Sequence, residues 1–425
     1  MSSQPALPPS GSFLQAIRTS ARKIRESSQI KVSLSIDHPA RFEVVMPFAN
    51  QINQDDVKRL ILSPAFTSTF QRVSQQHGLA LPLNFSSPIA ELNLISILSL
   101  LNFASGYRLP LHEATKRGAW DNIRALVFGL YISSASDEGD LMSARGMAAI
   151  SEAKVAELLR VDIYVEKPHS AIPGVTVGEL GGPLYELVKL ITGVLNETGK
   201  ILLDSGYPDL GTFVAESLKE GARVKSSSNT PDADVDAILE KLVRAFPAFQ
   251  DMATVNGEPV YCFKKALFLI HAIRIRFGES SSAFPVPDTT RIPVFSDNVL
   301  PSLLVHLGVL DITSSPGLSH LFPGARETYT SLLESSSSSE VDENTAIKDG
   351  PVLTVEQAFT LRAAAIDACE IIVETAQTME MDTSLQWLKS ITLPDVDGWL
   401  WSIAKDRKDY RKRLERFVLR DTVFF

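Results

Sequence analysis

Residues 89–103 read IAELNLISILSLLNF, which is the longest apolar stretch of the chain and decides the class of its fold. The stretch carries Glu91 and Asn93 and is shorter than the roughly 20 residues that a membrane-spanning helix needs. We therefore predict a helix buried in the protein core, and no membrane segment. Helical periodicity continues on both sides of it, which predicts a mainly α-helical protein.

The N-terminal helix is expected at 13–25, because Phe13, Ile17, Ala21 and Ile24 recur at the spacing of one helix face. The basic residues of this segment then lie on its solvated side, which we prefer to a mitochondrial presequence. Similar patterns predict further helices at 55–62, 120–131, 151–159, 183–203, 235–245 and 260–277.

Strand signals are few and short in this sequence. The best of them are at 31–36 and 42–45, so we expect only a small β element near the start. Residues 171–182 contain several Gly and Pro residues and are expected to form a loop.

The 425 residues are long enough for two or three domains or for one large one. Residues 1–12 are rich in Pro and Ser and are predicted to form a disordered tail. Residues 13–425 are predicted to form a single large helical domain with a few short strands. Polar segments near 225–234 and at 334–350, the second acidic and rich in Ser, are expected as exposed insertions.

Charge and cysteine content exclude several classes of protein. The 41 Lys and Arg residues against 50 Asp and Glu give a net charge of −9, which argues against a protein that grips nucleic acid by its phosphates. A small anionic nucleotide can still bind in a locally basic pocket.

Cys262 and Cys369 are the only cysteines, so we expect neither a disulfide framework nor a cysteine-rich metal site. A reducing compartment, the cytoplasm, is the expected location.

The common sequence motifs of nucleotide and ester chemistry do not occur in the chain. It has no phosphate-binding Gly-x-x-x-x-Gly-Lys loop, no Gly-x-Gly-x-x-Gly after a strand and no Gly-x-Ser-x-Gly. The seven histidines are scattered without the spacing of metal ligands. We therefore expect neither a metal nor a cofactor.

Two charged residues are candidates for catalysis. Asp297 precedes a predicted helix that has Pro301 in its first turn, and the simplest interpretation is that Asp297 caps this helix. The alternative is a carboxylate held ionised at a helix N-terminus, where it could stabilise an oxocarbenium-like centre as a glycosidic bond breaks. Lys264 lies in an apolar run, so it is either a buried lysine with a shifted pKa or a surface lysine with a buried stem.

Several segments, taken in order along the chain, carry a resemblance to a known family. They are SARKIRESSQIKV (20–32), ELNLISILSLLNF (91–103), VLNETGKILL (194–203), FPAFQD (246–251), FKKA (263–266), FSDNVLP (295–301), VHLGVL (305–310), LRAAAIDACEII (361–372) and WLWSIAK (399–405). No single motif among them is highly specific, but the ordered set, which runs through most of the chain, resembles the queuosine salvage family, the queuosine 5′-phosphate N-glycosylase/hydrolases.

The resemblance implies a mostly helical fold similar to that of helix-hairpin-helix DNA glycosylases. It also implies a hydrolase that cleaves the N-glycosidic bond of queuosine 5′-monophosphate with water. The products would be ribose 5-phosphate and queuine, a 7-deazaguanine-type base that is salvaged into tRNA modification. The implied partners are this small-molecule substrate and water, without direct contact to nucleic acid.

The resemblance also assigns residues to the site. Asp297 matches the family's active-site aspartate, which would activate water or face the positive charge on the sugar. Lys264 matches the pocket lysine, which would bind the phosphate or ribose or keep Asp297 ionised. The matched substrate-binding residues are Asp288, which would hydrogen-bond the base or sugar, Asn102 and Phe103 at a helix end, where Phe103 offers a stacking face, and Phe263 beside the lysine.

The chain departs from the family pattern at several positions. Residues 104–106 are Ala-Ser-Gly where aromatic residues are usual, Ala272 replaces a common acid, and Asn298 with Val299 replaces a Tyr-Arg pair. Residues 417–425, FVLRDTVFF, lack a basic His-Arg-x-Arg stretch before the terminal aromatic pair.

These departures leave two alternatives open. One is a catalytically inactive relative that acts as a binding or scaffold protein, which the missing basic stretch favours. The other is a glycosylase that acts on nucleic acid, against which the pI near 5.4 argues. The range of substrates and the oligomeric state are open as well.

Overall fold

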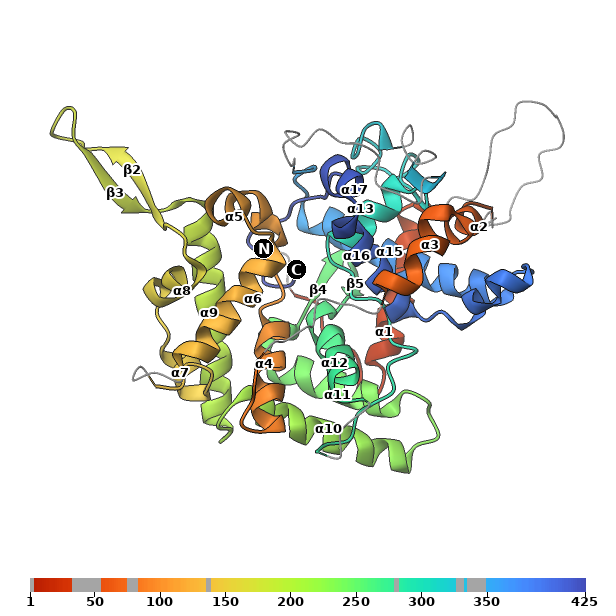
Figure 1. Cartoon of the computed structure of the whole chain (residues 1–425), viewed down its shortest axis with the longest axis horizontal. Helices are drawn as coiled ribbons and strands as arrows, with labels where there is room; N and C mark the ends of the chain where they lie inside the picture. Colours follow the sequence, from red (N-terminus) through yellow and green to blue (C-terminus); the bar gives the residue numbers. More distant parts are fainter. Residues whose placement is uncertain are drawn as a thin grey trace.

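The computed structural model describes residues 4–32, 55–74, 83–134, 139–278, 283–325, 332–334 and 349–425. Within these ranges the fold is mainly α-helical, which confirms the predicted fold class, and its strands form three antiparallel pairs (Figure 1). The likeness to helix-hairpin-helix DNA glycosylases stays a prediction. The α-helices are α1 Phe13–Ser27, α2 Asp55–Leu62, α3 Pro64–Val73, α4 Pro88–Leu100, α5 Arg108–Thr115, α6 Ala119–Ser133, α7 Ala144–Ala149, α8 Glu152–Leu159, α9 Gly182–Asp204, α10 Leu210–Ser227, α11 Ala233–Ala245, α12 Lys264–Phe277, α13 Val299–His306, α15 Val355–Thr378, α16 Leu393–Asp406 and α17 Lys408–Arg413.

The strands are short and pair two by two. They are β1 Lys31–Val32 with β6 Leu310–Asp311, β2 Tyr164–Pro168 with β3 Thr176–Leu180, and β4 Met252–Val255 with β5 Glu258–Tyr261. Three short 3₁₀ helices complete the described elements: η1 Ser105–Tyr107, η2 Pro247–Phe249 and η3 Thr383–Ser390.

Helix α4 is the buried helix predicted from the longest apolar stretch. It begins where the Ser87 hydroxyl accepts a hydrogen bond from the backbone N–H of Ala90, with Pro88 in the first turn. Its polar residue Asn93 is buried but satisfied, because it donates to Met142 O and accepts from the backbone N–H of Gly211. A side chain at Gly211 would meet the Asn93 backbone at 2.6 Å, so this helix contact requires glycine.

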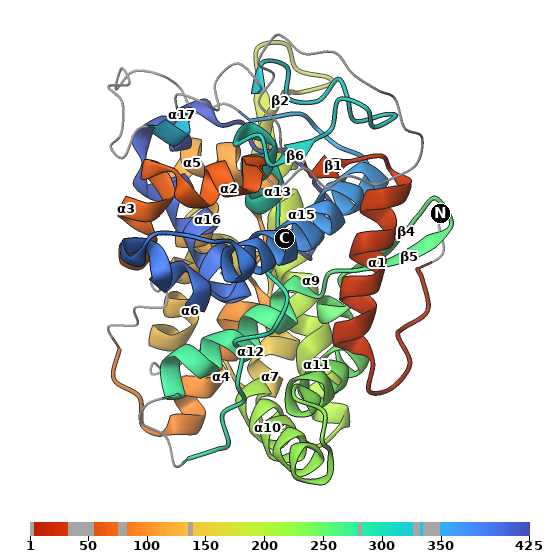
Figure 2. The same ribbon diagram turned by 90° about the vertical axis from the view of Figure 1, so that its right-hand side faces the viewer.

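Helix α1 lies along α15, which comes from the other end of the chain (Figure 2). The residues predicted to form its apolar face are all buried, and Arg25 pairs with the buried Asp367 of α15. The preceding residues 4–12, expected as a tail, contact the body of the protein: the Ser10 hydroxyl donates to Glu240, and Tyr261 donates to Ala6 O.

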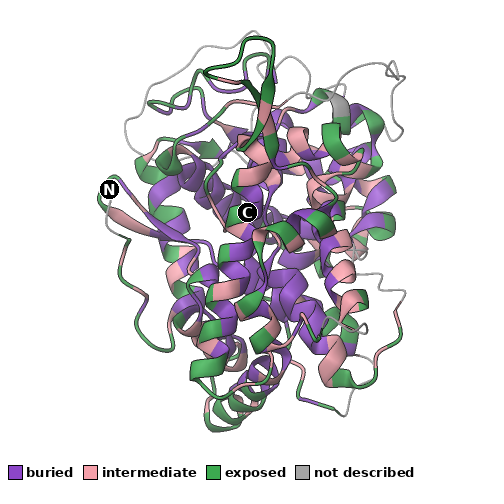
Figure 3. Cartoon of the chain, turned by 90° about the vertical axis from the view of Figure 1, so that its left-hand side faces the viewer, coloured by how far each residue is buried: buried purple, intermediate pink, exposed green. Residues whose placement is uncertain are grey.

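The helices gather in two groups above a shared base (Figure 1). Helices α5 to α9 form one group, and α1 to α3 with α13 and α15 to α17 form the other. Helices α4, α10, α11 and α12 lie beneath both, and the buried residues form one continuous core under exposed outer faces (Figure 3). Residues from both groups approach each other where α5 and α6 face α13, α16 and α17, and the site described below lies there.

Two predictions from the sequence are wrong in part. Residues 171–182 are not all loop, because Thr176–Leu180 form strand β3; both strands of this ribbon are exposed, so no alternation of buried and exposed residues marks it. The single helix at 260–277 is instead the end of β5 followed by α12. Both elements are buried, and a continuous apolar run does not distinguish a strand from a helix.

Other predicted segments fall partly outside the described residues. These are most of strand 31–36, all of strand 42–45 and most of the acidic segment 334–350. Residues 228–232, within the other predicted insertion, join α10 to α11.

In the described part of the chain no single helix is long and apolar enough to cross a membrane; one bent pair, Pro88–Leu100 with Ser105–Thr115, meets that test by length and composition.

Candidate active site

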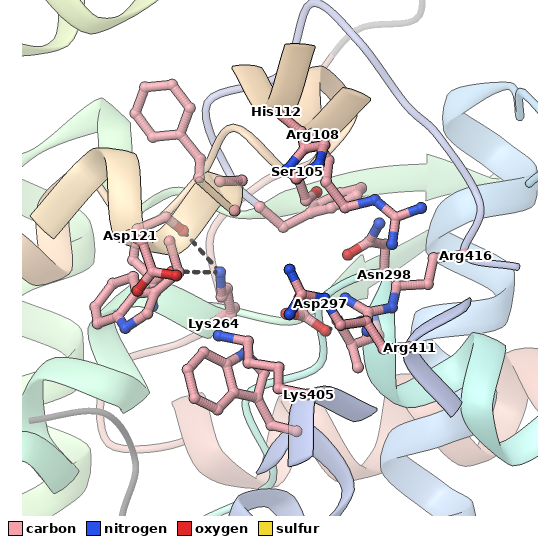
Figure 4. Close-up of a pocket in the computed structure, with 18 residues that line it drawn as sticks. Ser105, Arg108, His112, Asp121, Lys264, Asp297, Asn298, Lys405, Arg411 and Arg416 are labelled. Atoms are coloured by element: carbon pink, nitrogen blue, oxygen red, sulfur yellow. Dashed lines mark hydrogen bonds between the residues drawn. The ribbon is translucent and has the colours of Figure 1, made fainter. Parts of the chain in front are cut away.

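A cavity of about 170 Å³ lies between the two groups of helices (Figure 4). One part of its wall comes from residues 102–121, around η1, α5 and the start of α6. Lys264 at the start of α12 and residues 297–299 at the start of α13 add a second part. The third comes from the C-terminal region, between Trp401 and Phe425. The cavity therefore joins segments that lie more than 300 residues apart in the sequence.

Lys264 is held in place by the residues just before it. Phe263 adopts a left-handed backbone (φ 46°), which is unusual for a residue other than glycine and turns the chain sharply from β5 into α12. The buried Asp251 fixes this turn: its backbone carbonyl accepts from the N–H groups of Cys262 and Phe263, and its Oδ2 accepts from the N–H of Lys264 at 3.0 Å. The turn directs the Lys264 side chain to the cavity.

A fully buried ion pair connects this turn to the segment that carries Asp297. Arg362 of α15 donates from Nη1 and Nη2 to the two carboxylate oxygens of Asp251, at 2.8 and 2.5 Å, and neither side chain is exposed to solvent. Its Nε donates to Ser296 O at 2.8 Å, and the Ser296 hydroxyl donates back to Arg362 O. One guanidinium thus holds the backbone next to both candidate catalytic residues.

The role of this pair was not predicted. FPAFQD and LRAAAIDACEII both belong to the resembling segments, but nothing in either indicates that Asp251 and Arg362 meet. The available signal was a charge inside each of two mainly apolar segments.

Asp297 has the capping role that the simpler interpretation of the sequence predicts, and its catalytic role stays a prediction. Its Oδ1 accepts from the backbone N–H groups of Val299 at 2.7 Å and Leu300 at 3.3 Å, so it does cap the start of α13. It also lines the cavity, although only 7% of the residue is exposed. A capping carboxylate is rigid, so the structural role also fixes the group at the cavity wall.

Lys264 is buried, with 5% exposure, so it is not a surface lysine. Its Nζ donates to Asn102 O at 2.7 Å and to Asn102 Oδ1 at 3.1 Å (dashed in Figure 4). Burial lowers the Lys264 pKa to about 8, and the nearby negative charge of Asp297 opposes this effect. The ammonium is therefore held beside Asp297 and is tied to the helix end at Asn102.

The structure brings four of the six predicted site residues to the cavity: Asp297, Lys264, Asn102 and Phe103. Phe263 is fully buried outside the cavity wall, where its ring packs on Phe13 and Tyr261. Asp288 is exposed, lies outside the wall and accepts hydrogen bonds from Thr290.

Several cations of the cavity wall were missed by sequence reasoning. They are Arg108 of α5, Lys405 of α16, Arg411 of α17 and Arg416, which follows α17. Burial lowers the pKa of Arg108, and it lowers that of Arg416 to about 9, with the neighbouring positive charge of Arg108 adding to the effect. Arg108 stands alone in the sequence, but the other three lie in residues 405–416, KDRKDYRKRLER, and this basic stretch was the available signal.

Some buried polar atoms of the wall have no hydrogen-bond partner among the described residues. Buried polar atoms in proteins are nearly always paired, so a group of unpaired ones in one cavity indicates a place for a polar ligand. The atoms are Ser105 Oγ, Trp120 Nε1, Asn298 Oδ1 and Arg416 Nε.

Asp397 of α16 is a second buried carboxylate near the site. Its Oδ2 accepts from the backbone N–H of Phe295 at 2.7 Å, two residues before Asp297. Burial raises the Asp397 pKa to about 8, and the negative charge of Asp297 adds to the effect. In the part of the chain that the structure describes, no group of three His, Cys, Asp or Glu residues is arranged to hold a metal ion.

The fold and the site define a mainly α-helical protein with a cation-rich pocket around a buried carboxylate and a buried lysine. The family model described as queuosine salvage protein matches residues 92–320, which is more than half of the chain. The chain therefore belongs to the queuosine salvage protein family.

Curated relatives carry a more specific name, queuosine 5′-phosphate N-glycosylase/hydrolase. The protein of that name from Bos taurus is 26% identical over 181 residues, which cover 42% of this chain and 43% of the relative. The one from Mus musculus is also 26% identical over 181 residues, 42% of this chain and 44% of the relative. The one from Sphaerobacter thermophilus is 30% identical over 118 residues, 28% of this chain and 34% of the relative. The matched segments thus span less than half the length of each relative.

Proposed function

We propose that this protein hydrolyses the N-glycosidic bond of queuosine 5′-monophosphate and releases queuine for salvage into tRNA modification. The observation that carries the proposal is that one cavity holds Asp297, Lys264 and a group of guanidinium cations. Membership of the queuosine salvage family and the name of the curated relatives support the choice of substrate.

Asp297 is the proposed catalytic group. As the bond between C1′ and the base breaks, positive charge develops on the ribose, and a fixed carboxylate stabilises it. Water then adds to C1′ and gives up a proton to Asp297, which acts as general base. The two backbone N–H groups that hold Oδ1 keep the carboxylate in position through both steps.

Arg108, Arg411 and Arg416 are the proposed phosphate-binding residues. Guanidinium groups bind phosphate through paired, charge-assisted hydrogen bonds, and Figure 4 shows the three on one side of the cavity. Arg411 and Arg416 immediately precede residues 417–425, the segment that lacks the family's basic stretch. Their position in the cavity supports an active enzyme over an inactive relative, because this region still carries cations that can bind a phosphate.

Lys264 is proposed to act through its charge. Two of its three N–H groups bind Asn102, so the ammonium is fixed beside Asp297, where its positive charge faces the carboxylate and can bind the ribose. The proposed partners are the nucleotide and water, without direct binding of nucleic acid, and the proposed location is the cytoplasm.

The test is release of free base, followed by chromatography, from three compounds: queuosine 5′-monophosphate, unphosphorylated queuosine and guanosine 5′-monophosphate. We expect release from the first and at most slow release from the other two. If the folded protein releases base from none of them, the proposal is wrong. Release from guanosine 5′-monophosphate at an equal rate would contradict the assigned substrate.

A further inference from the structure

The chemistry of the leaving base raises a question that Asp297 does not answer. A purine is commonly activated as a leaving group by protonation at N7, but a 7-deazaguanine-type base has carbon at that position. When its bond to C1′ breaks, the electron pair stays on the base, which must accept a proton at another atom. The cavity therefore needs a proton donor as well as a carboxylate. This inference rests on the proposed function.

Lys405 has the position that such a donor needs. It belongs to the last turn of α16 and lines the same cavity as Asp297 and Lys264 (Figure 4). Its Nζ lies 3.1 Å from the centre of the Trp401 ring, a contact that keeps the side chain over an apolar surface. The contact with the Trp401 ring thus holds the ammonium at the cavity without a conventional hydrogen bond from any of its N–H groups.

The two cavity lysines differ in how they are bound. Lys264 donates to two oxygen atoms of Asn102, whereas Lys405 Nζ makes no hydrogen bond with any residue that the structure describes. A lysine whose protons are committed to protein oxygens is a poor donor to a substrate. Lys405 is therefore the better placed of the two to transfer a proton.

The charges around Lys405 suit an acid that works near neutral pH. Burial lowers the Lys405 pKa to about 7. Asp121 and Asp297 face it with negative charge and raise the pKa, while Arg416 and Arg124 face it with positive charge and lower it. An acid with a pKa close to the working pH is protonated often enough to act and gives up its proton readily.

We propose that Lys405 is the general acid that protonates the leaving base. As the bond to C1′ breaks, its electron pair moves into the base, and one proton of the Lys405 ammonium passes to a base nitrogen or oxygen. The resulting amine is neutral. Water forms the new bond to C1′ and loses its proton to Asp297, and exchange with solvent then restores the protonated lysine and the free carboxylate.

The test compares two substrates that share ribose 5-phosphate but differ in the leaving group, and therefore in whether that group must be protonated by an acid. Queuosine 5′-monophosphate needs a protonated leaving group, whereas 4-nitrophenyl β-D-ribofuranoside 5-phosphate releases a stable phenolate without one. For Lys405→Met we expect kcat on the nucleotide to fall by about 10²–10⁴-fold, the range of general acid catalysis, and kcat on the nitrophenyl compound to fall far less. Asp297→Asn is the matched control and should lose activity on both.

The variant Lys405→Arg distinguishes the effect of losing the proton donor from the effect of losing the positive charge. Arginine keeps the positive charge but holds its proton too tightly to donate it, so the loss on the nucleotide should persist. Wild-type kcat on the nucleotide should also fall as pH rises above about 7, because Lys405 loses its proton, and this decrease should be missing in Lys405→Arg.

Three results would overturn the assignment. Equal losses on both substrates would make Lys405 a binding residue, and activity unchanged on the nucleotide would give it no role. Full activity in Lys405→Arg would show that charge alone suffices. Inactivity of the wild-type protein on both substrates would instead be a failure of the proposed function itself.

Discussion

The two walls of the cavity differ in how their side chains are held. The wall inside the family match carries Lys264 and Asp297, and buried hydrogen bonds fix both of them. The C-terminal wall lies beyond residue 320 and presents Lys405, Arg411 and Arg416, which have few or no partners in the described part of the protein. In the function that we propose, the first wall positions the reacting centre, while the second supplies the proton donor and two of the three phosphate-binding arginines.

The walls are nevertheless coupled through one residue. Arg362 lies on α15, beyond the family match, yet it holds Asp251 and Ser296, which position the two residues of the first wall. Its guanidinium also packs against Phe425, which lines the cavity, with 4.3 Å between the guanidinium carbon and the ring centre. Changes at Arg362 are therefore expected to affect both walls.

The largest expected effect concerns the first wall. Asp297→Asn should lower kcat by about 10³-fold, because it removes both the charge that stabilises the ribose cation and the base that accepts the proton of water. The fold and the affinity for the nucleotide should persist, since an asparagine oxygen can still cap α13. Base release under single-turnover conditions and circular dichroism measure the two properties.

Asp288→Asn is the control for that variant, since it makes the same chemical change in the same part of the chain. Asp288 is exposed and outside the cavity wall, so near-normal turnover is expected. A large loss at Asp288 with a small one at Asp297 would reverse the assignment of the catalytic carboxylate.

The next effect concerns the buried pair that connects the walls. Arg362→Met should lower the free energy of unfolding by about 3–5 kcal/mol, because it leaves the Asp251 carboxylate buried without its partner. Arg22→Met removes one arginine of another ion pair, but Arg22 is 64% exposed and should cost at most about 1 kcal/mol. Urea unfolding of both variants gives the comparison, and similar losses would contradict it.

A smaller effect is expected from the phosphate-binding residues. Arg411→Ala should raise KM for queuosine 5′-monophosphate by about 10- to 150-fold, since losing one charge-assisted hydrogen bond costs about 1.5–3 kcal/mol. Any slow turnover of unphosphorylated queuosine should be unaffected. Arg413→Ala, on the same helix but outside the cavity wall, is the matched control. Equal changes for both substrates would place the phosphate elsewhere.

A separate effect is a change in how stability depends on pH. Because the Asp397 pKa is raised to about 8, the folded protein keeps a proton on Asp397 that the unfolded chain has lost above its ordinary pKa near 4. Folding stability from this group is therefore present at low pH and is lost as pH rises toward 8, by at most about 1.4 kcal/mol per pH unit.

Asp397→Asn removes this titration while keeping an acceptor for the Phe295 N–H. The variant should gain stability relative to the wild type as pH rises from 5 to 8. Thermal unfolding at each pH measures the difference, and two parallel curves would contradict the raised pKa.

Local patterns in the sequence were sufficient for much of the fold. The buried helix at 89–103, the amphipathic N-terminal helix and the cap at Asp297 all depend on residues within a few positions of each other, so periodicity and capping predicted them. Asp297 and Lys264 were found in the same way, as charges in unusual local surroundings, and the ordered segments indicated the family.

Only the tertiary structure decided which charges meet. Asp251 and Arg362 lie 111 positions apart, and Lys405 shares a cavity with residues near position 120. Such pairings depend on how α12, α13, α15 and α16 are placed relative to one another. Periodicity within one segment predicts which face of a helix is buried, but not which other helix packs against that face. The ribbon of β2 and β3 was missed because both strands are exposed and show no alternation of buried and exposed residues. The break before α12 was missed because contacts with Asp251, rather than local preference, hold the left-handed turn at Phe263.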